Sequence, residues 1–218
     1  MLYIHDEEND LEVIAPSSPG GMGTMGMNSH AIAITTNALY GMLNSSLNGL
    51  PVNFVLRKVL ACKSLESAQT FLTSVQHASA ENYIVGDKTQ VVNFECAANK
   101  VTTYSPYDGA TWVCHTNHPL TNDDTIFPVT AARTSSTFDR FEYLYQRLTS
   151  YDRAPSLNTI QYLLRSHEGP VCVHHQFKPM SGFTQASAIF ELTDQPTMYL
   201  TMGPPCLTDY EAYRFEAQ

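Results

Sequence analysis

The sequence is poor in basic residues, with 12 lysines and arginines against 21 aspartates and glutamates and a net charge of -9 over 218 residues. Nucleic-acid binding needs a basic face that displaces counterions from phosphates, and no basic cluster occurs here. No apolar run is long enough to span a bilayer, and the acidic stretch Asp6–Asp10 stands where a secretory leader would be basic and then apolar. The composition therefore predicts no nucleic-acid partner, no membrane partner and a cytoplasmic location.

Cysteine pairs are also missing. The five cysteines are scattered, odd in number and never in CxxC spacing; they are Cys62, Cys96, Cys114, Cys172 and Cys206. Buried, reduced thiols are a better interpretation of this pattern than a disulfide framework. The sequence also begins with Met1 and has no cysteine at its first position.

Hydrophobic periodicity predicts strands and helices within one domain, residues 1–218. Short apolar or β-branched runs between turn residues predict strands at Leu11–Ala15, Ala31–Thr36, Asn82–Val85, Gln90–Cys96, Val101–Tyr104, Thr111–His115, Val171–His175, Ala186–Leu192 and Thr197–Met202. Apolar residues at helical spacing predict helices at Phe54–Leu60, Ser64–Val75, Thr137–Thr149 and Ser156–Ser166. This order of elements is typical of an α+β layered sandwich.

Seven segments, in this order along the chain, resemble the penicillin acyltransferase-like branch of the Ntn hydrolases, which is related to the choloylglycine hydrolases. The most specific is Cys114–Leu120, with the sequence CHTNHPL. The others are Met27–Gly41, Pro51–Arg57, Glu81–Tyr83, Val92–Glu95, Ser135–Arg140 and Met202–Cys206. The resemblance implies a four-layer αββα sandwich, here apparently lacking its N-terminal strands.

The resemblance also implies amide chemistry and a set of site residues. Enzymes of this branch attack amides with a cysteine at the start of the mature chain, whose α-amine activates its own thiol. Asn117 and Asn37 match positions near the oxyanion, where an asparagine NH₂ can donate a hydrogen bond. Arg140 matches an arginine that supports the surroundings of the nucleophile. The alternatives are turn capping for the two asparagines and, for Arg140, a solvated helix charge paired with Asp139 or Glu142.

Histidines and cysteines also gather in two places, His115 with His118, and Cys172 with His174 and His175. Neighbouring side chains of a strand point to opposite faces, so we expect ordinary packing and no metal or other cofactor. The same reasoning separates the Cys114 thiol from His115 and makes Cys114 a poor replacement nucleophile. Glu95 keeps two interpretations, as a group that supports the site or as a solvent-facing strand residue.

Two functions follow from these observations. The resemblance predicts a cysteine Ntn amidohydrolase or acyltransferase for linear amide C–N bonds, with a small-molecule amide or acyl donor as partner and acyl-CoA among the candidates. Because a first-position cysteine is absent, we expect the chain as written to be inactive, either as a fragment or as a natural short homologue. The alternative is a non-catalytic binding or assembly protein on the same fold. Unpaired sheet edges predict a homo-oligomer, or association with the missing N-terminal segment.

Overall fold

Two antiparallel sheets form the centre of the molecule in the computed structural model, which describes residues 1–218 except 19–20, 22, 40–42, 129–135, 175–181 and 217–218. The larger sheet has its strands side by side in chain order: β1 (Leu2–Asp6), β2 (Leu11–Ala15), β3 (Gly26–Asn28), β4 (Ala33–Ala38), β5 (Glu81–Gly86), β6 (Val91–Cys96) and β7 (Val101–Tyr104). The smaller sheet has the order β10 (Glu211–Arg214), β9 (Thr197–Thr201) and β8 (Ser187–Glu191).

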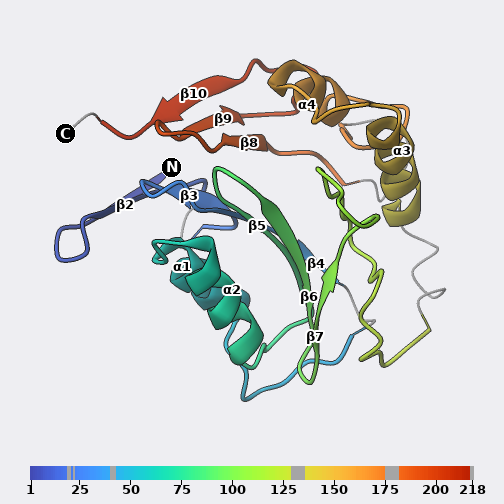
Figure 1. Ribbon diagram of the computed structural model, residues 1–218. Coiled ribbons are helices and arrows are strands. Elements are labelled where there is room, and N and C mark those ends of the chain that lie inside the picture. Colours follow the sequence, from blue (N-terminus) through green and yellow to red (C-terminus); the bar gives the residue numbers. More distant parts are fainter. Residues whose placement is uncertain (19–20, 22, 40–42, 129–135, 175–181, 217–218) are drawn as a thin grey trace.

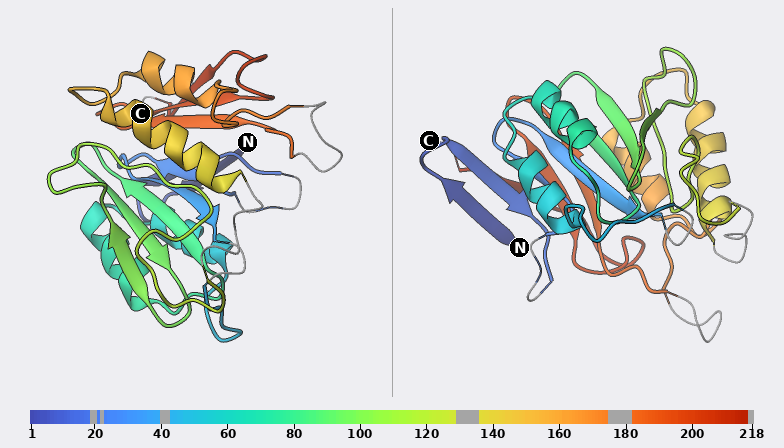
Figure 2. Two further views of the ribbon diagram at one scale, coloured as in Figure 1. Left: turned by 90° about the vertical axis from the view of Figure 1, so that its right-hand side faces the viewer. Right: turned by 90° about the horizontal axis from the view of Figure 1, so that it is seen from below.

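Helices lie on both sides of this pair of sheets. Helices α1 (Val52–Leu60) and α2 (Leu65–Ser74) cover one face of the larger sheet, and the smaller sheet lies against its other face (Figure 1). Helices α3 (Thr137–Thr149) and α4 (Leu157–Leu164) lie beside the smaller sheet, on the side of the molecule away from α1 and α2 (Figure 2). The arrangement is the predicted four-layer αββα sandwich. Within the described residues, no helix has the length and apolar character needed to span a membrane.

Alternation of side chains along the strands divides the larger sheet into an apolar face and a face with polar residues. Tyr83, Val85 and Phe94 pack in the main core beneath α1 and α2. Their neighbours on β5 and β6 therefore point the opposite way, toward the side of the smaller sheet. At β2, the face of the larger sheet that meets the smaller sheet is apolar, and Ile14 packs there with Met198 of β9.

Local chemistry explains where several elements begin. Ser64 caps α2, as predicted, because its hydroxyl accepts a hydrogen bond from the Ser67 backbone N–H at 3.2 Å. The strand predicted from Ala31 begins at Ala33, because Ala31 has a φ of 59° in the turn after β3. The Asn28 side chain accepts hydrogen bonds from the N–H groups of His30 and Ile32 and so holds this turn.

Two predicted strands are wrong. Residues 111–115 are irregular and do not pair with a neighbouring strand. They lead into a loop that is held by hydrogen bonds from His115 and Thr121 to the Glu95 side chain. Residues 171–174 are irregular too, with the backbone of Cys172 bonded to Ser166 and that of Val173 to the Thr184 hydroxyl, and His175 lies outside the described residues. Strands β1, β3 and β10 were not predicted. Strands β3 and β10 are only three and four residues long, and β1, although it alternates in burial over five residues, runs directly into an acidic turn.

Candidate active site

A row of polar side chains crosses the larger sheet at one end of its central strands. Asn37 of β4 lies opposite Asn82 of β5, and Asn82 lies opposite Glu95 of β6. Asn82 and the nearby Asn93 are buried, and their side-chain amides have no hydrogen-bond partner among the residues that the structure describes. Because buried amides normally find partners, these two point to a polar space that another group can fill.

Glu95 forms a fully buried ion pair with His115, whose Nε2 lies 2.7 Å from Glu95 Oε1. Burial raises the pKa of Glu95, but hydrogen bonds from His115 and from the backbone N–H groups of Leu120, Thr121 and Asn122 outweigh it and lower the pKa overall. Glu95 is therefore ionised at neutral pH. Of the two interpretations from the sequence, the solvent-facing one is wrong.

The same loop docks on the first turn of α3 through hydroxyl groups. The Thr116 hydroxyl donates to the Thr137 backbone carbonyl at 2.9 Å, and the Asn117 backbone N–H donates to the Thr137 hydroxyl at 2.7 Å. His118 stacks on Phe138 with ring centroids 4.1 Å apart. Burial, followed by the charges of His115 and Arg140, lowers the pKa of His118 to about 4, so His118 is neutral at pH 7.

The structure brings together the three site residues predicted from the sequence. Asn117 Nδ2 donates to the Ala38 carbonyl at 2.8 Å, beside Asn37 at the end of β4. Asn117 Oδ1 accepts from Arg140 Nη2 at 2.8 Å. Arg140 thus orients the Asn117 amide, whose Nδ2 carries a second N–H. Arg140 Nε also donates to the Ser136 hydroxyl at 3.2 Å, and its pairing with Asp139 or Glu142 stays a prediction. Ser135, at the predicted helix start, lies outside the described residues.

None of the five cysteines lies at this polar row. Cys96 packs in the main core on the opposite face, and burial raises the pKa of its thiol. Cys114 packs with Trp112 and Leu148, and burial raises its pKa to about 12. His115 contacts Glu95 and the Thr116 carbonyl, so it does not activate Cys114. Cys62 donates to the Lys58 carbonyl, and Cys172 and Cys206 contact each other.

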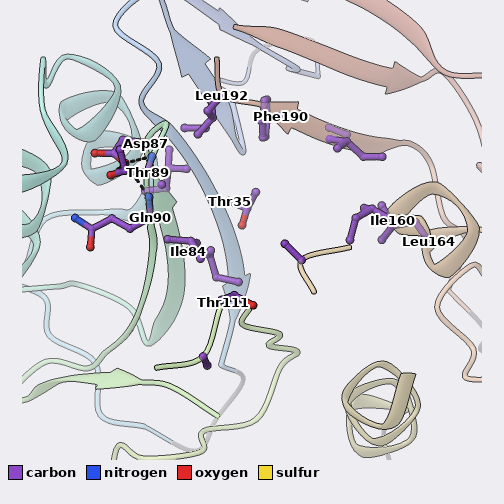
Figure 3. A pocket seen from close by; sticks show the side chains of 18 residues that line it. Thr35, Ile84, Asp87, Thr89, Gln90, Thr111, Ile160, Leu164, Phe190 and Leu192 are labelled. Carbon is purple, nitrogen blue, oxygen red and sulfur yellow. Dashed lines mark hydrogen bonds between the residues drawn. The ribbon is translucent and has the colours of Figure 1, made fainter. Parts of the chain in front are cut away.

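A largely apolar cavity of about 730 Å³ lies between the two sheets. Thr35 of β4 and Ile84 of β5 line one side, and Ile160 of α4 and Phe190 of β8 line the other (Figure 3). Among the described residues of the lining, Asp87 alone is charged, and its carboxylate accepts hydrogen bonds from Thr89 and Gln90 in the β5–β6 turn. The cavity therefore suits an uncharged, apolar group.

The cavity and the polar row lie along the same strands. Asn37 follows Thr35 by two residues on β4, and Asn82 precedes Ile84 by two residues on β5. Two residues of a strand span about 7 Å and return to the same face of the sheet. An apolar chain in the cavity would thus place a polar head at the asparagine row.

These features define an Ntn-hydrolase-type αββα protein, and comparisons with known proteins agree. An arginine-to-leucine variant of conjugated bile acid hydrolase from Clostridium perfringens superposes with a TM-score of 0.59 at 12% identity, covering 95% of this chain and 82% of that chain. A cysteine-to-alanine variant of the same hydrolase gives a TM-score of 0.54 at 13% identity, with the same coverage of both chains. No curated protein sequence matches the chain.

The family model for acyl-coenzyme A:6-aminopenicillanic acid acyl-transferase matches residues 1–205. The chain belongs to this family. The predicted resemblance and fold class are therefore confirmed, and the function is that of an Ntn amidohydrolase- or acyltransferase-like protein.

The groups that support the site could not be identified from the sequence alone. The Glu95–His115 pair joins residues that are 20 positions apart, and no spacing rule predicts such a contact. Asn82 and Asn93 looked like ordinary strand residues. Only Asn93 had a signal in the sequence, as an asparagine between Val92 and Phe94, where a strand buried on both faces normally carries an aliphatic side chain.

Proposed function

We propose that this chain supplies the acyl-binding and oxyanion-stabilising parts of a cysteine Ntn amidohydrolase or acyltransferase for linear amides. The observation that supports the proposal is that Thr35 and Ile84, which line the apolar cavity, stand two residues from Asn37 and Asn82 on the same strands and the same face of the sheet. The acyl group fills the cavity, and the amide carbonyl lies near Asn37 and Asn117, whose NH₂ groups can donate to a developing oxyanion.

The nucleophile comes from outside the five cysteines of this sequence. A thiol must ionise readily and reach the carbonyl to attack it. Cys96 and Cys114 are buried with raised pKa values, and both lie away from the asparagine row. The 218-residue chain by itself is therefore inactive towards amides by the family mechanism, and it acts with a nucleophile-bearing segment or as a binding protein.

The lining of the cavity restricts the substrate to a small-molecule amide or acyl donor. The described part of the lining contains no lysine or arginine, so phosphate groups of a donor such as acyl-CoA would have to remain outside it. Free cysteines support a reducing, cytoplasmic setting for the reaction. Association with a second copy or with a separate segment belongs to the same proposal, because β8 is an edge strand of the smaller sheet.

Binding of a fluorescent N-acyl amide to the purified chain tests this function. We expect saturable binding that strengthens with acyl length and is lost in Ala188→Trp, which fills the cavity from β8. Ala212→Trp places the same side chain on the exposed surface of β10 and should leave binding unchanged. Both variants are checked for folding by circular dichroism.

A second pair of measurements separates the polar row from the cavity. Asn37→Ala should weaken binding of the N-acyl amide roughly tenfold, the value of about one hydrogen bond, and should leave binding of the matching alkyl alcohol unchanged. Equal loss for both ligands, or binding to Ala188→Trp as tight as to the unchanged protein, would overturn the assignment.

A further inference from the structure

A second cluster of reactive side chains lies away from the asparagine row, between the loop after α4 and the loop after β9. His167, Cys172 and Cys206 each bring one ligand atom to within 4.8 Å of the other two. The two sulfur atoms are 3.3 Å apart. Cys172 thus lies with His167 and Cys206, while the sequence had grouped it with His174 and with His175, which lies outside the described residues.

We propose that His167, Cys172 and Cys206 bind a zinc ion. Two thiolates and an imidazole are ligands that zinc prefers. Zinc–sulfur bonds of about 2.3 Å and zinc–nitrogen bonds of about 2.0 Å in a tetrahedron place ligand atoms about 3.5–3.8 Å apart. The cluster already has nearly this spacing, so small side-chain rotations complete it.

Hydrogen bonds and prolines preorganise the three ligands. His167 Nδ1 lies 2.9 Å from the Cys172 carbonyl, and a bond donated from Nδ1 leaves the Nε2 lone pair for a metal. The Cys172 backbone N–H donates to the Ser166 carbonyl at 2.9 Å and closes the loop that joins His167 to Cys172. Cys206 follows two prolines, which restrict the backbone before it.

The fourth coordination position lies beside His174. The ring of His174 is 5.0 Å from that of His167 between centroids, and His174 lines a cavity of about 620 Å³ together with His167 and Cys172. Three protein ligands with an accessible fourth position can accept His174 or water. The ion would tie together two loops that are 34 residues apart.

Metal analysis of the intact chain tests this proposal. The protein is incubated with equimolar zinc, passed through a desalting column and measured by mass spectrometry of the elements. We expect about one zinc per chain in the unchanged protein and at least tenfold less in Cys172→Ser and Cys206→Ser. Cys62→Ser, at another poorly exposed cysteine outside the cluster, is the matched control and should retain zinc.

Cobalt substitution gives a readout that does not depend on a variant that folds. Cobalt bound by two thiolates in a tetrahedral site gives intense charge-transfer and visible absorption, which zinc then displaces. Absence of these bands together with a zinc content at trace level would overturn the proposal. An intact mass lower by two hydrogens, showing a Cys172–Cys206 disulfide in the native protein, would also overturn it.

Discussion

At the residue scale, the buried carboxylate of Glu95 organises the loop that carries Asn117. It accepts hydrogen bonds from the His115 ring and from three successive backbone N–H groups, those of Leu120, Thr121 and Asn122. A buried charge is stable only when it is paired and fully hydrogen-bonded, and here the partners belong to the loop itself. The Glu95 carboxylate therefore holds the loop that positions Asn117.

Protonation of His118 should make the protein acid-sensitive. The pKa of His118 is about 4 in the folded protein and about 6.5 when unfolded, so the unfolded chain binds more protons between these values and stability falls as pH drops through this window. Relative to pH 8, this residue should cost about 2 kcal/mol of unfolding free energy at pH 5. Urea unfolding at both pH values measures the difference.

His118→Gln removes the titrating group and should lose less stability between pH 8 and pH 5 than the unchanged protein. Part of the dependence remains, because burial also lowers the pKa of His77. His5→Gln, at a side chain that is 54% exposed, is the control. An unchanged pH dependence in His118→Gln would show that His118 is protonated equally in both states.

Asn117 and Arg140 could be predicted from the sequence, while their supporting groups could not. Asn117 lies in a specific motif, and the resemblance places Arg140 near it. The link between them, and the contact of Asn117 with the Ala38 carbonyl 79 residues away, depends on how the loop meets α3 and β4. Such contacts are set by tertiary packing, which leaves no periodic pattern in the sequence.

At the element scale, helices with strong periodicity were predicted well and loops shaped by side chains were not. Helix α3 has the predicted bounds, Thr137–Thr149, and α2 begins after its predicted cap. Residues 111–115 have strand-forming composition, yet the segment leads into the Glu95 loop and stays irregular. Buried polar contacts thus override local propensity at the part of the chain that carries the site.

The packing of α3 against the loop after α4 depends on one glycine. A Cβ at Gly169 would lie 2.1 Å from the Tyr143 ring of α3. Gly169→Ala should therefore destabilise the protein by about 1–3 kcal/mol, because the helix and loop must separate. Thermal unfolding followed by circular dichroism measures this loss. Gly182→Ala, whose new Cβ would meet nothing within 4 Å, should change stability little, and equal effects of the two would contradict this packing.

At the scale of the whole molecule, a cavity lies between the two sheets, and Asn37 and Asn82 stand two residues from its lining residues Thr35 and Ile84. The order of strands and helices predicted an α+β layered sandwich, and the family resemblance predicted its four αββα layers. The cavity could not be predicted, since it is lined by residues from β4, β5, β8 and α4 that are far apart in the chain. The single domain and the oligomeric state stay predictions.

Turnover by the purified 218-residue chain tests the central claim most directly. The chain is saturated with an N-acyl amide whose binding has been established by fluorescence, and release of free amine is followed by mass spectrometry. We predict bound amide and no release above buffer, because no cysteine of this sequence lies at the asparagine row. Release that requires one of the five cysteines, and is lost when that cysteine is changed to serine, would contradict the account.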